Sequence, residues 1–311
     1  MENAIVESVS QDHSITLSPV SNVNVVSVGN QAIVVPDIVR PDQLRFSLNV
    51  DVLKQFLNEL SSIVDEARLV FNVTDGLVAH VVDPAYISMV QTGIALEMFE
   101  EIDWTPKAVT VSEDGYMTEL GVDVDKLVSY LKAIKLKDTV LKFSVDFVKR
   151  RMTIQSPTGE RVISLIDTTG MSDPKIPTLN LPFKIEVKDP KTFRGLIRQA
   201  SEISDHIALS YDSVANAMWL DCESDMDRLH AQVDGDILET GYSTRERITP
   251  TGETERYQTK DCRSLFPLQY VADFVKAIPS TFTLEIGNDY PLKLQYGRTT
   301  YLLAPRIESN D

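Results

Sequence analysis

An internal repeat constrains the fold of this chain more than any other feature of its sequence. The first unit is an alternating strand pattern, then a helical pattern, then further strands, at residues 44–49, 50–64, 69–73, 77–82 and 86–96. The same order recurs about 140 residues later, at residues 183–187, 189–204, 207–211, 217–222 and 228–233. A chain with such a period is expected to fold as copies of one unit.

Two shorter units repeat the same order. A helix-bearing segment and its strands occupy residues 120–136, 140–145 and 152–155, and their later counterparts occupy 265–278, 282–286, 292–296 and 300–303. Lys132 and Lys276 fall at matching places in the two helices. Each helix has one apolar stripe, which must be buried on a sheet. We therefore predict an α+β fold of two similar domains, each made of two β-α-βββ halves.

Local signals mark the turns and the domain boundaries. Asp75 followed by Gly76 predicts a tight turn, and Asp189 followed by Pro190 predicts the start of a helix. The predicted division of the chain is an N-terminal extension at 1–42, domains at 43–166 and 182–308, a Gly- and Pro-containing connection at 167–181, and a tail at 309–311. The extension is rich in Val, Ser and Asn, and we expect it to be loosely ordered or to add an edge strand.

The formal net charge of −16 argues against a nucleic-acid partner if the charge is spread evenly. Basic residues nevertheless recur on the polar faces of all four predicted helices, at Lys54, Lys126, Lys132, Lys135, Lys191, Arg194, Arg198 and Lys276. Acidic residues cluster elsewhere, at 97–103, 113–114, 221–227 and 234–239, although Asp51 and Glu59 also fall on the first helix. We expect a segregated surface on which the helix faces meet polyphosphate.

The residues that carry catalysis in known enzymes form no recognisable set in this sequence. The four histidines stand singly, the two cysteines have no metal-ligand or disulfide spacing, and neither a phosphate-binding loop nor a dinucleotide fingerprint is present. Asp221 and Glu223 could be paired carboxylates of a hydrolase, but a solvated strand end is the better interpretation. No apolar run reaches the roughly 18 residues of a membrane span. We expect an intracellular binding protein, not an enzyme, with no cofactor and no metal.

Several short strings resemble the sliding clamps of the proliferating-cell-nuclear-antigen family in their archaeal form. The most specific is LLAPRIE at residues 302–308, which resembles the C-terminal signature of that family. Others, in the family's order, are VDPAYISMVQ at 82–91, SDHI at 204–207, PLQYV at 267–271 and NDYPLKL at 288–294. The resemblance covers about residues 44–308. The extension at 1–42 has no counterpart in the family, and the segment 240–260 is longer or more polar than expected.

The resemblance implies a ring of three subunits whose helices line a hole for duplex DNA. Residues that match basic positions of the family are Lys54, Lys132, Arg194, Arg198 and Lys276. Other family positions are not basic here, and the residues that could compensate are Lys126, Lys135, Lys149, Arg150 and Arg151. DNA contact through such residues is independent of sequence.

The resemblance also implies a pocket for partner peptides and a head-to-tail subunit interface. The pocket residues would be Val82, Tyr86, Met89, Ile176, Pro177, Pro291, Leu302, Leu303, Ala304 and Pro305. The interface would join Arg161, Ile163 and Leu165 of one subunit to Leu229 and Ala231 of the next. Implied partners are a clamp loader and DNA polymerases, flap nucleases and ligase-type proteins that carry a clamp-interacting peptide. A subunit of a heterotrimeric or checkpoint-type clamp is the alternative.

Overall fold

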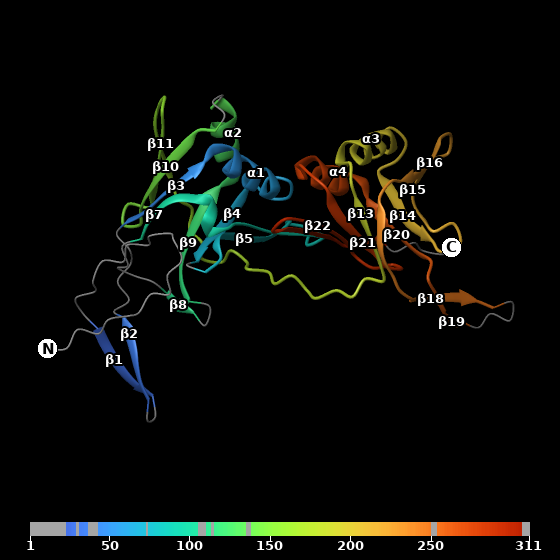
Figure 1. Ribbon diagram of the computed structural model, residues 1–311, viewed down its shortest axis with the longest axis horizontal. Coiled ribbons are helices and arrows are strands. Elements are labelled where there is room, and N and C mark those ends of the chain that lie inside the picture. Colours follow the sequence, from blue (N-terminus) through green and yellow to red (C-terminus); the bar gives the residue numbers. More distant parts are fainter. Residues whose placement is uncertain are drawn as a thin grey trace.

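A computed structural model describes residues 23–28, 31–36, 43–72, 74–104, 110–112, 115–134, 138–249 and 254–306. Within these residues the α-helices lie on one side of an elongated molecule and the sheets extend below them (Figure 1). The helices are α1 (Val50–Leu60), α2 (Val124–Ala133), α3 (Pro190–Ser201) and α4 (Leu268–Ala277). A short 3-10 helix, η1, spans Leu96–Met98.

Side-chain caps fix where α1, α2 and α3 begin. Asn49 accepts a hydrogen bond from the backbone N–H of Asp51 at α1, and Asp189 accepts one from Lys191 at α3, directly before Pro190. The predicted helix start at Asp189 is thereby confirmed. Both helices end earlier than the predicted residues 64 and 204, because α1 gives way to a turn after Leu60 and α3 ends at Ser201.

All paired strands in the described residues are antiparallel, and most belong to three sheets. The five-stranded sheet has the order β12 (Gly159–Ser164), β11 (Arg151–Ser156), β10 (Val140–Asp146), β3 (Gln43–Asn49), β7 (Phe99–Trp104). The four-stranded sheet has the order β16 (Arg228–Val233), β15 (Ala217–Glu223), β14 (His206–Asp212), β20 (Cys262–Pro267). These two sheets therefore end in the strands β12, β7, β16 and β20.

A ten-stranded sheet joins the two copies of the repeat. Its order is β17 (Asp236–Thr240), β13 (Phe183–Val187), β21 (Phe282–Ile286), β22 (Leu292–Tyr296), β23 (Thr299–Leu303), β6 (Ser88–Ile94), β5 (Gly76–Val82), β4 (Glu66–Asn72), β9 (Gly115–Asp123), β8 (Thr110–Ser112). The seam is the pair of β23 with β6, in which Leu302 lies opposite Met89. One sheet thus runs through both halves of the molecule, which the sequence did not predict.

The predicted duplication is confirmed element by element. The four β-α-βββ units are β3-α1-β4-β5-β6, β9-α2-β10-β11-β12, β13-α3-β14-β15-β16 and β20-α4-β21-β22-β23. The tight turn predicted at Asp75-Gly76 joins β4 to β5. Gly76 has φ +85, and a Cβ there would lie 2.1 Å from the carbonyl oxygen of Ile94, so this position requires glycine. The predicted domain boundaries stay a prediction.

Two hairpins lie outside the large sheets. Strands β1 (Val23–Val28) and β2 (Gln31–Pro36) pair with each other and with no other strand of the described chain, so the expected edge strand is not formed. Strands β18 (Ser243–Ile248) and β19 (Thr254–Thr259) form a second hairpin that projects away from the helices (Figure 1). The polar segment at 240–260 is therefore an arm rather than an extension of a sheet.

A buried polar cluster joins α1 to the second domain at the seam. Glu59 is 4% exposed, which corrects its predicted place on the polar face of α1. Its carboxylate accepts hydrogen bonds from Gln55 (2.8 Å), Thr299 (2.9 Å), Thr92 and Tyr296. Burial and the neighbouring Glu59 raise the pKa of Tyr296. Since a buried carboxylate is stable only when its oxygens are hydrogen-bonded, this cluster depends on strands from both domains.

Candidate functional site

Exposed basic side chains of the helices include those of Lys132, Arg198 and Lys276. They lie on α2, α3 and α4 respectively, and the helices share one side of the molecule (Figure 1). Lys191, in the first turn of α3, is also exposed. These cations belong to helices on the same side of the molecule, so they can meet an extended polyanion without rearrangement of the sheets.

Lys54 and Arg194 occupy equivalent places in the two domains but are half-buried. The Nζ of Lys54 donates to the carbonyl oxygen of Ile134, which caps the C-terminal end of α2 (3.0 Å). Nη1 of Arg194 donates to the carbonyl oxygens of Val275 (3.1 Å) and Ile278 (3.0 Å) at the end of α4. Helix C-termini carry unpaired carbonyls and a partial negative charge. These two cations therefore hold the helix pairs together, a role that the sequence did not indicate.

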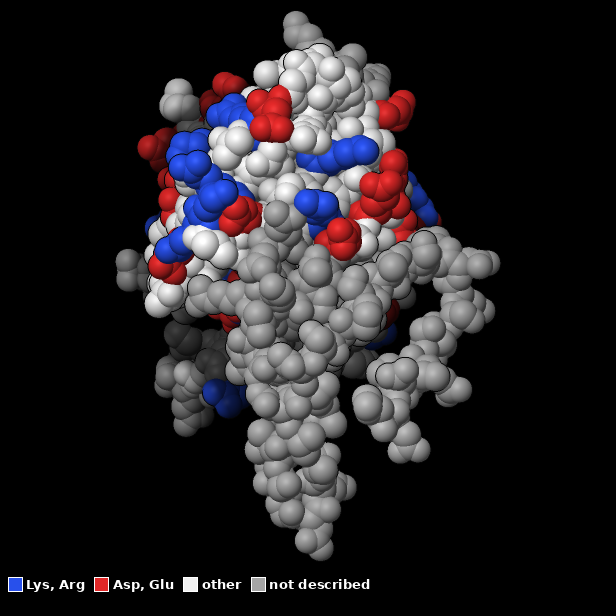
Figure 2. All heavy atoms as spheres, turned by 90° about the vertical axis from the view of Figure 1, so that its left-hand side faces the viewer, with Lys and Arg blue, Asp and Glu red and all other residues white. Residues whose placement is uncertain are grey.

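The remaining predicted DNA contacts bind local carboxylates or lie outside the described residues. Lys126 pairs with Asp123 (2.6 Å) and Lys149 with Asp146 (3.4 Å). Arg150 pairs with Asp167 (3.3 Å). Lys135 lies outside the described residues. At the end of the molecule that carries the five-stranded sheet, basic and acidic side chains lie side by side (Figure 2). That end does not present a uniformly basic field.

Several residues of the predicted peptide pocket come from three adjacent strands and the segment after them. In register, Val82 lies opposite Met89, and Met89 opposite Leu302. The backbone N–H of Ala304 donates to the carbonyl oxygen of Ile87 (2.9 Å), which brings the loop before β6 beside the C-terminal segment. This contact places Tyr86, which is 78% exposed, near the half-buried Ala304.

Two of the predicted pocket residues belong to the core instead. Leu303 is fully buried and Leu302 is 5% exposed, so a peptide reaches neither without displacing other side chains. Pro291 and Pro305 are half-buried and accessible in part. On the connecting segment Ile176 is half-buried and Pro177 is exposed, and this segment runs along the sheet side of the molecule (Figure 1).

Two residues to which the sequence assigned no role, Asp83 and Tyr270, meet beside this pocket. The hydroxyl of Tyr270 on α4 donates to Oδ2 of Asp83 (2.9 Å). An Asp directly before Pro84 favours a turn held by the Asp side chain, which is a signal that the sequence did contain. Nothing in the sequence pairs that aspartate with a tyrosine from the other domain.

The strands β12 and β16 each have one free edge in the described chain. They lie in different sheets, and β16 and β11, the neighbour of β12, are at opposite ends of the molecule (Figure 1). Val162 on β12 is 51% exposed, whereas Ile163 and Leu165 pack partly on the core. The guanidinium of Arg161 lies 4.9 Å from the ring centroid of Tyr130. On β16, both Leu229 and Ala231 are half-buried.

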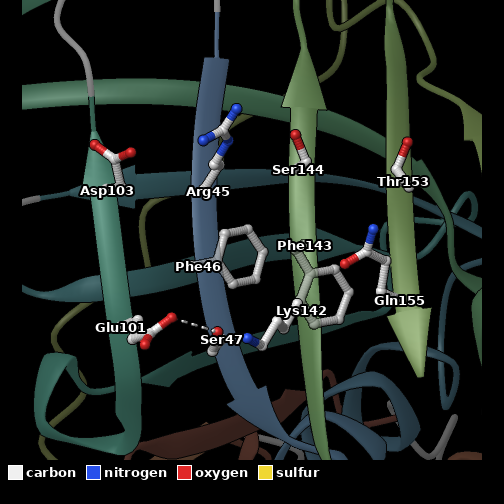
Figure 3. Close-up of a pocket in the computed structure, with 10 residues that line it drawn as sticks. All are labelled: Arg45, Phe46, Ser47, Glu101, Asp103, Lys142, Phe143, Ser144, Thr153 and Gln155. Atoms are coloured by element: carbon white, nitrogen blue, oxygen red, sulfur yellow. Dashed lines mark hydrogen bonds between the residues drawn. The ribbon is translucent and has the colours of Figure 1, made fainter. Parts of the chain in front are cut away.

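A hollow of about 460 Å³ opens on the outer face of the five-stranded sheet (Figure 3). Polar side chains from four strands surround it: Arg45, Ser47, Glu101, Asp103, Lys142, Ser144, Thr153 and Gln155. The stacked rings of Phe46 and Phe143 alternate with these residues along β3 and β10. Its lining is polar and of mixed charge, unlike the apolar surface that a hydrophobic peptide needs.

The cysteines, histidines and acidic residues are the remaining candidates for catalytic or metal chemistry. The described chain contains no group of three or more His, Cys, Asp or Glu side chains close enough to hold a metal ion. Burial raises the pKa of Cys262 to about 12, so this thiol is not a nucleophile near neutral pH. His230 lies 2.6 Å from Asp221 on the surface of the β15–β16 pair and stacks on Trp219. No helix in the described part of the chain is long and apolar enough to cross a membrane.

Comparisons with known proteins give one consistent picture. No model of a protein family matches the chain. A DNA polymerase sliding clamp of Methanococcoides burtonii is 30% identical over 277 residues, covering 85% of this chain and 100% of the relative. One of Methanocella arvoryzae is 29% identical over 273 residues, covering 85% and 98%. The solved structure of A. fulgidus PCNA bound to the C-terminal region of FEN-1 superposes with a TM-score of 0.67 at 24% identity, covering 86% of this chain and 100% of that one.

Proposed function

The chain belongs to the DNA polymerase sliding clamp family, and we propose that it is a processivity factor that encircles duplex DNA as a homotrimer. The observation that carries this proposal is the arrangement of the helices on one side of the molecule (Figure 1), since Lys132, Arg198 and Lys276 are exposed residues of three of them. A ring needs no tight DNA contact, because its topology retains it on the strand. Weak phosphate contacts then allow it to slide.

Ring closure would use the free edges of β12 and β16. Identical subunits close a ring through head-to-tail contacts, which require two different surfaces on each subunit. These two edges are such surfaces, and pairing them would also cover exposed strand edges. The proposed contacts are Arg161, Ile163 and Leu165 of one subunit with Leu229 and Ala231 of the next. The mixed charges at the β12 end suit a protein partner better than DNA.

Partner proteins would dock at the surface formed by Val82, Tyr86, Met89, Pro291, Ala304 and Pro305, with Ile176 and Pro177 approaching from the connecting segment. The complex of A. fulgidus PCNA with the C-terminal region of FEN-1 supports a flap nuclease among the partners. The family name supports a DNA polymerase. A clamp loader and ligase-type proteins with similar peptides complete the proposed set, and all of them act inside the cell on DNA. The clamp itself performs no chemistry.

The experiment that tests this function is loading onto circular DNA. We expect a clamp loader to retain the protein on nicked circular duplex DNA and linearisation of that DNA to release it. Retention after linearisation would contradict encirclement. Light scattering at micromolar concentration should give three times the chain mass of 34.8 kDa. A monomer that forms a ring only with a second, related chain would instead identify a heterotrimeric clamp subunit.

A further inference from the structure

One aspartate organises the whole loop between β5 and β6. Oδ1 of Asp83 accepts hydrogen bonds from the backbone N–H groups of Ile87 (2.7 Å) and Ser88 (2.6 Å), and Oδ2 accepts one from Ala85 (3.1 Å). The N–H of Tyr86 donates to the carbonyl oxygen of Asp83 (2.9 Å). Pro84 has no N–H, so every amide donor of the loop from residue 84 to residue 88 is directed at Asp83.

The fourth hydrogen bond to the Asp83 carboxylate crosses between domains. It comes from the hydroxyl of Tyr270, in the first turn of α4, at 2.9 Å from Oδ2. Asp83 is 4% exposed, so its charge depends on these donors for solvation. Burial acts to raise the pKa of Asp83, but the hydrogen bonds from Ser88, Tyr270, Ala85 and Ile87 outweigh burial and hold it below its ordinary value.

The loop held in this way presents the most exposed residue of the proposed pocket. Tyr86 has φ +58, a backbone conformation that a tyrosine rarely adopts, and its side chain is 78% exposed. The carbonyl oxygen of the next residue, Ile87, accepts the hydrogen bond of the Ala304 N–H. Loss of the Asp83 contacts would thus free Tyr86 to relax and would loosen the C-terminal segment beside it.

We propose that Asp83 and Tyr270 are positioning residues of the partner-peptide pocket, through which α4 fixes the loop that carries Tyr86. This inference rests on the proposed function of the pocket. Neither side chain needs to touch the peptide. Their effect is to hold the loop in its binding conformation before the peptide arrives, so that the peptide does not bear the cost of ordering it.

The probe for this inference is the peptide of the C-terminal region of FEN-1 that is bound to A. fulgidus PCNA in the solved structure, titrated calorimetrically. Tyr270→Phe removes one hydroxyl and should weaken the peptide Kd about tenfold, as expected for one hydrogen bond to a charged group. Asp83→Asn should weaken it more, since an amide NH₂ in the place of Oδ2 would face the N–H of Ala85, which can only donate. Tyr130→Phe removes a hydroxyl from the equivalent helix α2 and should leave the Kd unchanged.

A spectroscopic readout separates positioning from general loss of structure. In NMR spectra of the trimer, the amide resonances of Ala85, Ile87 and Ser88 should move in both pocket variants and not in Tyr130→Phe. Resonances of β16, at the far end of the molecule (Figure 1), should stay in place in all three. If Tyr270→Phe and Asp83→Asn bind the peptide within twofold of the parent protein, the inference is wrong. If the parent protein itself binds no peptide, the proposed pocket is wrong instead.

Discussion

Arg194 and Arg198 lie one turn apart on α3, yet the structure gives them different roles. Arg194 is half-buried and donates two hydrogen bonds to the carbonyl oxygens of Val275 and Ile278, whereas Arg198 is exposed. Replacing each by Met keeps the aliphatic stem and removes the guanidinium. Arg194→Met should therefore destabilise the protein, and Arg198→Met should not.

The expected loss in the free energy of unfolding follows from the contacts that each substitution removes. A hydrogen bond to a charged group contributes roughly 1.5–3 kcal/mol, and a cation at a helix C-terminus about 0.3–1 kcal/mol more. Arg194 is half-buried, so water can enter where its guanidinium was and replaces part of what is lost. We expect a net loss of about 2 kcal/mol for Arg194→Met, and less than about 0.5 kcal/mol for Arg198→Met, as for other surface substitutions.

The assay for stability is equilibrium unfolding in urea, with circular dichroism as the signal. The assay for DNA contact is equilibrium binding to short linear duplex DNA across a salt series, because a linear duplex does not retain a ring by topology. Arg198→Met should remove about one phosphate contact for each subunit that engages DNA. The slope of log K against log salt concentration should then become less negative by about 0.9 for each lost contact. The division of roles is refuted if Arg198→Met destabilises as much as Arg194→Met, or if Arg194→Met is neutral.

Four further predictions test other parts of the structure. Glu59→Leu should cost about 2–4 kcal/mol in urea unfolding, because it leaves buried hydroxyl donors without an acceptor; an unchanged midpoint would show that the cluster is dispensable. Because the folded pKa of Asp83 is lowered, its ionised form stabilises the protein above the unfolded value near 3.9, and this contribution disappears as pH falls through the folded pKa. The stability difference between the parent and Asp83→Asn should thus shrink between about pH 5 and pH 3; a constant difference would contradict that assignment. Leu229→Glu, at the free edge of β16, should convert the trimer to monomer in light scattering while the far-UV circular dichroism spectrum of the folded chain is kept; a trimer of unchanged mass would contradict the proposed interface. Gly76→Ala should cost at least about 1–3 kcal/mol, since the new methyl would meet the carbonyl oxygen of Ile94.

Periodicity in the sequence was enough to predict most of the secondary structure. Alternating and helical patterns reflect one buried face, and the hydrophobic effect that buries this face acts locally along each element. The duplication and the predicted start of α3 at Asp189 followed from such patterns. The predicted ends of the first and third helices lay beyond the observed ends. Ile63 and Val64 pack on the core at helical spacing although their backbone forms a turn.

The roles of individual polar residues were decided by tertiary structure alone. On a helical wheel, Lys54, Glu59 and Arg194 all fall at solvent-facing positions. Their surroundings depend on which helix end or strand lies opposite: the end of α2 for Lys54, the end of α4 for Arg194, and strands of the other domain for Glu59. A helical wheel records the angle of a side chain about its own axis and nothing of the neighbouring elements.

The pocket shows the same division between what sequence and structure determine. The string at residues 302–308 indicated the family and the place of the pocket, but not that Leu302 and Leu303 are buried. Their burial results from the pairing of β23 with β6, which joins strands about 200 residues apart. Likewise, Asp83 before Pro84 is a turn signal that the sequence contains, but only the packing of α4 against that turn supplied Tyr270. Local pattern determines the elements, whereas contacts between distant elements determine which side chains remain available to DNA and to partners.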